Sequence, residues 1–208
     1  MSDSLRTSLL AGGLGMLFMH AQVYSLRMML FLRYIFFFHF MEFVSTALFN
    51  PTRVSADSFL IPHSNSYTMV FIFSLLEYNF SFYTEKSQIL FILGIIVTTG
   101  GQFMRTYAMY SAKQSFNHKV QLAKAEDHVL ITNGAYKLCR HPSYFGFYWW
   151  SIGTQFILGN YIGLLIHIVM LTAFFKSRVK VEEAYLVEFF GNDYVEYKKN
   201  VKTWIPLV

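Results

Sequence analysis

Six long runs of apolar residues constrain this chain more than any other feature of its sequence. They cover residues 8–26, 28–49, 67–82, 89–110, 142–158 and 161–175. A helix rises about 1.5 Å per residue, so each run crosses, or nearly crosses, the roughly 30 Å hydrocarbon core of a bilayer. Lipid offers the backbone no hydrogen-bond partner, and the runs must therefore be helical. The sequence predicts an all-α, polytopic integral membrane helical bundle with about six transmembrane segments, the last two forming a C-terminal hairpin.

The charged residues support this interpretation and give it a direction. Only 14% of the residues are charged, whereas about a quarter are charged in a soluble domain. Most of the basic residues lie in residues 111–140 or after residue 175. Basic residues in short loops are retained in the cytosol, so we place both stretches there, and six crossings place the N-terminus there too. The net charge of +5 then reflects topology, and we expect no nucleic-acid partner.

The order of apolar and polar stretches predicts one domain over residues 1–208 with three parts. Residues 1–110 form four transmembrane helices, residues 111–141 form a polar cytosolic segment, and residues 142–208 form the hairpin and cytosolic helices. The lone cysteine, Cys139, excludes an internal disulfide. It is either a small apolar residue near a helix start, which we favour, or a thiol activated by the adjacent Arg140.

Ionisable groups cluster at one mouth of the hairpin. Pro142 suits the first position of a helix, and the backbone N–H groups that follow it can hold an anion such as a carboxylate. The alternative is a plain helix start capped by water. At the exit, Arg178 and Glu182 share one helical face, where Arg178 can grip a carboxylate and Glu182 can accept two hydroxyls from a ribose. The alternative there is an intrahelical ion pair on a solvated face.

Six motifs, in this order along residues 101–206, carry a resemblance to a known family. They are Ser115 to His118 with Gln121; His128 through Gly134 to Tyr136; Arg140 to Tyr144 with Gly146; Ser151 to Gln155; Arg178 with Glu182 and Glu183; and Glu196 to Lys199. Together they resemble the isoprenylcysteine carboxyl methyltransferase family, whose members are integral membrane enzymes. The N-terminal hundred residues resemble the family mainly in being apolar and helical.

The resemblance implies methyl transfer from S-adenosylmethionine to the α-carboxylate of a C-terminal farnesyl- or geranylgeranyl-cysteine. It implies prenylated CaaX proteins such as small GTPases as partners, a multi-pass location in the endoplasmic reticulum membrane with the active site facing the cytosol, and no metal. It assigns the substrate carboxylate to Arg178 and places Arg105 in the same catalytic pocket. The implied cofactor-binding residues are Gln121, His128, Val129, Leu130, Ile131, Tyr136, His141, Pro142, Ser143, Tyr144 and Glu182. Self-association stays open.

Two other functions remain as alternatives. A membrane sterol reductase of related architecture would use a nicotinamide cofactor, but residues 129–142 offer no obvious extra arginines for a 2′-phosphate. A non-catalytic prenyl-protein receptor would keep the pocket without turnover, although the retained Arg178 and Glu182 argue against such decay.

Several ionisable residues fall inside the apolar runs and are either structural or in contact with substrate. Glu42 and Arg33 are too far apart on one segment to pair, so each is expected to meet another helix. The aromatic runs at 36–38 and 148–150 pack, face lipid, or line a prenyl tunnel. The ionisable set is His20, Arg33, His39, Glu42, Glu77 and His167.

Overall fold

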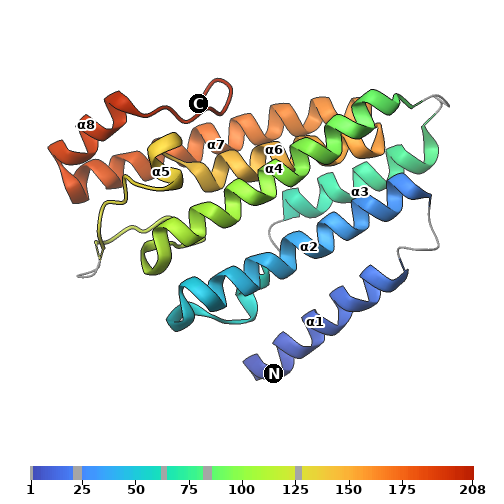
Figure 1. Cartoon of the computed structure of the whole chain (residues 1–208), viewed down its shortest axis with the longest axis horizontal. Coiled ribbons are helices and arrows are strands. Elements are labelled where there is room, and N and C mark those ends of the chain that lie inside the picture. Colours follow the sequence, from blue (N-terminus) through green and yellow to red (C-terminus); the bar gives the residue numbers. More distant parts are fainter. Residues whose placement is uncertain (1, 21–24, 62–64, 82–85, 125–127) are drawn as a thin grey trace.

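The computed structural model describes residues 2–20, 25–61, 65–81, 86–124 and 128–208, and its six long helices coincide with the six predicted runs. Successive long helices run antiparallel (Figure 1). The last of them continues past the end of its apolar run at residue 175 and includes the helical face predicted for Arg178 and Glu182, and no strand occurs in the described ranges. The long helices are α1 (Asp3–His20), α2 (Leu26–Phe49), α3 (Asn65–Phe80), α4 (Gln88–Ala112), α6 (Pro142–Leu158) and α7 (Tyr161–Phe190).

Short helices gather at the end of the bundle where α4 and α7 finish (Figure 1). Between α2 and α3 lie η2 (Pro51–Arg53) and η3 (Ala56–Phe59), and after α4 lie η4 (Lys113–Ser115) and α5 (Ala135–Leu138). The C-terminal helix α8 (Asn192–Asn200) follows α7 directly. The segment that we predicted to be cytosolic is therefore mostly irregular, with brief helical turns.

The hairpin turn is built by local sequence and by a neighbouring helix. Gly159 ends α6 in the left-handed conformation, with φ 68°, a region that glycine enters without strain. Glu77 of α3 then caps the start of α7, where its two carboxylate oxygens accept the backbone N–H groups of Ile162 at 2.9 Å and Gly163 at 2.6 Å. A carboxylate at this position satisfies otherwise unpaired donors and complements the helix dipole.

Three helical stretches are long and apolar enough to cross a membrane: Leu26–Phe49, Gln88–Ser115 and Tyr161–Phe190. The other long helices have 18, 16 and 17 residues. At about 1.5 Å per residue they are close to the thickness of the hydrocarbon core but do not exceed it. The protein is thus a helical membrane protein, and six complete crossings stay a prediction.

Helices α4 and α6 approach so closely that glycine is required at their contact. A Cβ atom on Gly101 would lie 2.5 Å from the backbone nitrogen of Trp150, and one on Gly146 would lie 2.7 Å from the backbone nitrogen of Arg105. Real Cβ atoms do not come this near to backbone atoms. The approach brings Arg105 of α4 against the first turn of α6.

Aromatic side chains fill the centre of the bundle around α6. The rings of Phe38 and Trp150 lie 4.5 Å apart, and Phe147 stacks on Trp150 at 5.9 Å. Phe37, the neighbour of Phe38, is exposed on the outside of the bundle. The aromatic runs at 36–38 and 148–150 therefore supply mainly core packing, with some side chains facing outward.

Candidate functional site

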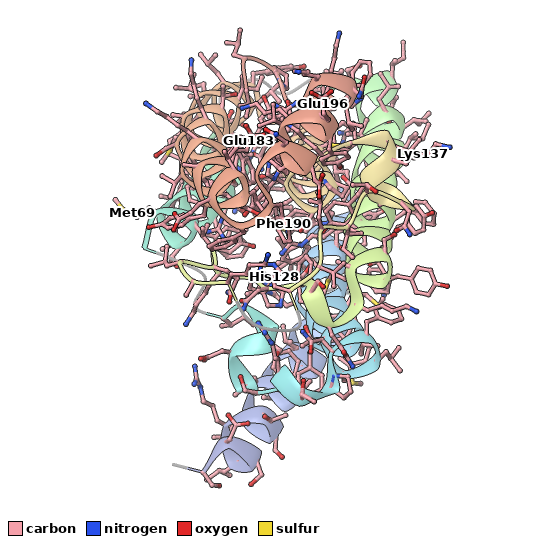
Figure 2. All side chains as sticks on the ribbon, turned by 90° about the vertical axis from the view of Figure 1, so that its left-hand side faces the viewer. Met69, His128, Lys137, Glu183, Phe190 and Glu196 are labelled. Carbon is pink, nitrogen blue, oxygen red and sulfur yellow. The ribbon has the colours of Figure 1, made fainter. Side chains whose placement is uncertain are left out.

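A polar pocket lies at the end of the bundle where α4, α6 and α7 meet the irregular segment. Figure 2 looks onto this end and shows His128 beside Phe190, with Glu183 earlier on α7. The walls of the pocket come from α4, the irregular segment, the first turn of α6, the second half of α7, and α8. The lining residues are Arg105, Ala112, Ser115, Phe116, Asn117, His118, His128, Val129, Leu130, Ile131, Tyr136, Arg140, His141, Pro142, Ser143, Tyr144, Glu182, Leu186, Phe190, Tyr194 and Tyr197.

The pocket brings together all but two of the residues predicted from the sequence. Gln121 lines a smaller hollow next to it, and the two share Ser115, Asn117, His128, Glu182 and Leu186. The side chain of Gln121 donates a hydrogen bond to the Lys119 carbonyl at 3.1 Å. Arg178 stands just outside the lining, but it bonds to two residues that belong to it.

Arg178 is fixed by neutral oxygen atoms. Its Nε donates to the Tyr144 hydroxyl at 2.7 Å, and its Nη2 donates to the His118 carbonyl at 2.6 Å. The Tyr144 hydroxyl in turn donates to a carboxylate oxygen of Glu182. Arg178 and Glu182 therefore meet through Tyr144, which replaces the direct intrahelical pair considered from the sequence.

Arg105 has a different environment, because a carboxylate holds it. Its Nε and Nη2 donate to the two carboxylate oxygens of Glu42 on α2, the second at 2.9 Å. Its Nη1 donates to the hydroxyl and the carbonyl of Ser143, at 3.0 and 3.3 Å. Glu42 is completely buried and Arg105 is only 6% exposed. The charge on Arg105 is thus balanced inside the bundle, while its outer edge faces the pocket.

The first turn of α6 faces the same pocket. Pro142 occupies the first helical position, and the first helical bond runs from the Phe145 N–H to the His141 carbonyl at 3.0 Å. The N–H groups of Ser143 and Tyr144 precede that bond and point toward the helix start, as at any helix N-terminus. The His141 ring stacks on the Tyr144 ring, with centroids 5.4 Å apart.

Glu183 connects three elements behind the pocket. It accepts hydrogen bonds from Arg140 Nε at 2.5 Å, His141 Nε2 at 3.1 Å and Lys198 Nζ at 2.5 Å. These contacts tie the segment that precedes α6 to α7 and α8. The motif analysis named Glu183 but assigned it no role, because neither its three partners nor their distances can be read from spacing along one helix.

Sequence reasoning also missed several lining residues. His118, Asn117 and Arg140 lay in quoted motifs, which gave a usable signal, whereas Tyr194 carried none.

Pairing between helices explains two of the intramembrane ionisable residues, since Glu42 pairs with α4 and Glu77 caps α7. His39 and His167 bond to the carbonyls of Phe59 and Gly163, and the side chain of His20 lies outside the described part of the chain.

A second cavity, mainly apolar, lies between α2, α3, α6 and α7. Its lining includes Phe31, Phe71, Phe147 and Phe174. Phe174 is one helical turn before Arg178, whose guanidinium carbon lies 6.0 Å from the Phe174 ring centroid. Arg178 therefore stands between the polar pocket and the apolar cavity.

The fold and the two cavities define a class: an all-helical membrane protein with a polar pocket at one end of the bundle and an apolar cavity between its helices. A family model described as the isoprenylcysteine carboxyl methyltransferase family matches residues 92–188. The chain belongs to this family, as the motifs indicated.

Curated relatives and a solved structure agree. The protein-S-isoprenylcysteine O-methyltransferase of Saccharomyces cerevisiae is 42% identical over 181 residues, which cover 82% of this chain and 76% of the relative. That of Homo sapiens is 42% identical over 175 residues, which cover 82% of this chain but 62% of the relative. A solved eukaryotic intramembrane Ras methyltransferase of the family matches with a TM-score of 0.89 at 34% identity, over 97% of this chain and 75% of that one.

Proposed function

We propose that this protein transfers a methyl group from S-adenosylmethionine to the α-carboxylate of a C-terminal farnesyl- or geranylgeranyl-cysteine. Its substrates are then prenylated CaaX proteins, small GTPases among them, and it works in the endoplasmic reticulum membrane with its pocket toward the cytosol. The observation that carries the proposal is the position of Arg178, held by Tyr144 and His118 between a polar pocket and an apolar cavity.

The polar pocket has the donor set that S-adenosylmethionine needs, and bound there the cofactor would supply an electrophilic methyl group. The Ser143 and Tyr144 N–H groups at the start of α6 suit its carboxylate. Glu182 uses one oxygen for Tyr144, and its other oxygen, 4.0 Å from His141 Nδ1, suits ribose hydroxyls. Apolar and aromatic side chains of the lining, Val129 to Ile131 with Tyr136, suit a flat base. We assign Gln121 to the adjoining hollow at the edge of the same site.

The chain must orient the acceptor rather than activate it with a base. A carboxylate is already ionised at neutral pH, so no proton has to be removed before it attacks. Arg178 can hold it in a fork and cannot protonate it, because a guanidinium stays charged. Positioning of this kind, with water excluded, removes several kcal/mol from a barrier.

The apolar cavity suits the prenyl chain of the same substrate. It reaches Phe174, one turn from Arg178, so a lipid tail lying in it would have its cysteine end near the guanidinium. This arrangement places the charged end at the polar mouth and the tail among helices that face lipid. A substrate with one charged end and one lipid tail also explains why the site needs a polar pocket and an apolar cavity.

The test uses membranes that contain the full chain, labelled S-adenosylmethionine and N-acetyl-S-farnesylcysteine. We expect base-labile methyl ester from the wild type and a loss of about a hundredfold or more with Arg178→Ala, because misplacing one reactant costs that much. Arg178→Lys should recover little, since a lysine lacks the fork. Lys180→Ala is the control, because Lys180 is exposed on the same helix. Donor binding without ester formation in the wild type would contradict the proposal and favour a receptor.

A further inference from the structure

We propose that Glu42 of α2 is a positioning residue that neutralises Arg105, so that the substrate carboxylate is held mainly by Arg178, which within the described residues bonds directly to no carboxylate. The inference rests on the proposed function. It concerns a residue outside the segment matched by the family model, residues 92–188. The N-terminal half of the bundle would then contribute directly to the electrostatics of the site.

The geometry of the pair supports this role. Glu42 meets Arg105 with both carboxylate oxygens, and its side chain has no exposed surface. The same carboxylate has an oxygen 3.6 Å from His118 Nδ1, and the His118 carbonyl accepts Arg178 Nη2 at 2.6 Å. Glu42 therefore bonds to Arg105 directly and lies beside His118, the residue whose carbonyl holds Arg178.

The two arginines differ in how their charge is compensated. Within the described residues, Arg178 donates to a hydroxyl and a carbonyl, both neutral, and it reaches the Glu182 carboxylate only through the Tyr144 hydroxyl. Arg105 instead forms a direct bidentate bond with a full negative charge. Paired charges in a poorly solvated site interact far more strongly than they do in water. A carboxylate entering the pocket is therefore attracted more strongly to Arg178 than to Arg105.

The neutralisation of Arg105 by Glu42 favours turnover. The reaction converts a carboxylate anion into a neutral ester, so an interaction that grows with the negative charge stabilises the substrate more than the transition state. Without Glu42, the guanidinium of Arg105 would also bind the substrate carboxylate tightly and slow its methylation. By neutralising Arg105, Glu42 leaves that side chain as a hydrogen-bond donor to Ser143 without over-binding the substrate.

The test compares a charged ligand with its neutral counterpart without any methyl donor. Purified full-length variants are titrated with N-acetyl-S-farnesylcysteine and with its methyl ester. For Glu42→Gln we expect the affinity for N-acetyl-S-farnesylcysteine to rise about tenfold, because coupling energies between close charges are at least this large. The affinity for the methyl ester should stay unchanged. In turnover, KM and kcat should both fall. Glu77→Gln is the matched control, because this buried glutamate caps α7 far from the pocket, and it should leave the carboxylate-to-ester affinity ratio unchanged.

A double-mutant cycle keeps the proposal testable if Glu42→Gln fails to fold. Arg105→Gln leaves Glu42 unbalanced, so it should weaken carboxylate binding and spare the ester. The double variant should return the carboxylate-to-ester ratio to the wild-type value. An unchanged ratio in either single variant, or equal losses for both ligands, overturns the proposal. Methylation by the wild type is measured separately, so a failure of this proposal can be distinguished from a failure of the proposed function.

Discussion

Single residues in the pocket are held mainly by contacts that cross between helices. Tyr144 of α6 links Arg178 and Glu182 of α7 through its hydroxyl, and Glu183 links the segment before α6 to α8. A hydrogen bond to a charged group contributes about 1.5–3 kcal/mol. The loss of one such contact therefore shifts several side chains of the site together.

Cys139 shows how burial decides the chemistry of a residue. Its side chain is 2% exposed, and its Sγ donates to the Thr203 carbonyl at 2.9 Å. Burial raises the pKa of this thiol from 9.0 to about 11, although Arg140 acts in the opposite direction. Of the two interpretations from the sequence, the structure supports the buried apolar residue.

We predict that Cys139 of the folded protein reacts negligibly with maleimide at neutral pH and reacts fully in denaturant. The pKa is higher in the folded state, so stability from the protonated thiol is present below pH 9 and declines as the pH rises toward 11. Labelling measured by mass shift across this range should rise with pH. Fast labelling of folded protein at pH 7 would contradict the prediction, and Cys139→Ser, which keeps a donor for Thr203, should remain active.

The motifs predicted residues that the pocket brings together from several helices, but the sequence did not predict the contacts that these residues make across the helices. The start of α6 and the face shared by Arg178 and Glu182 follow from Pro142 and helical spacing. The pair formed by Glu42 and Arg105 spans 63 residues, and no periodicity on either helix specifies it. The role of Glu183 was missed for the same reason.

Among the elements, α4 and α6 set the geometry of the site through their glycine contact. Gly101 and Gly146 remove the side chains that would separate the two backbones. In membranes, small residues at helix contacts allow close packing without a hydrophobic driving force. The resulting approach fixes the distance from Arg105 to Ser143, and thereby one wall of the pocket.

We predict that Gly101→Ala lowers the free energy of unfolding and the activity, whereas Gly100→Ala changes neither by much. A Cβ on Gly101 would lie 2.5 Å from the Trp150 nitrogen, while one on Gly100 meets nothing within 4 Å. Overpacking typically costs about 1–3 kcal/mol. Thermal unfolding in detergent and ester formation measure the two effects. Equal behaviour of the two variants would show that the helices do not pack this closely in the membrane.

The apolar runs predict where the long helices lie, but they do not predict the full length of each helix. The runs located the six long helices, and Gly159 with Asn160 marked the hairpin turn. They do not include the later turns of α7, which are polar, but the helical spacing of Arg178 and Glu182 predicted that part, and the helix continues to Phe190. The length of an apolar run indicates how much of a helix contacts the membrane, whereas the full length of the helix depends on tertiary contacts as well.

At the scale of the whole molecule, the alternating directions of the long helices place both chain halves around one functional end. The start of α1 lies beside η3, where Asp3 accepts the Ala56 N–H at 3.1 Å and Arg6 pairs with Asp57 at 2.8 Å. Asn50, just after α2, donates to the carbonyls of Gln114 and Phe116. The N-terminal helices thus support the same end that carries the pocket (Figure 1).

This arrangement predicts which parts of the chain are reached from the cytosol. Cys139 is the only cysteine, so Cys139→Ser gives a cysteine-free background for single reporters. Lys137 is exposed beside the pocket end (Figure 2), and Gln88 is exposed at the start of α4, at the opposite end of the bundle. In sealed vesicles with the cytosolic face outward, an impermeant maleimide should label Lys137→Cys at once and Gln88→Cys only after permeabilisation. The positive-inside distribution and the antiparallel helices both require this order. Labelling of both variants in intact vesicles would mean that α4 does not cross the bilayer. Labelling of Gln88→Cys in intact vesicles, with Lys137→Cys labelled only after permeabilisation, would invert the whole orientation.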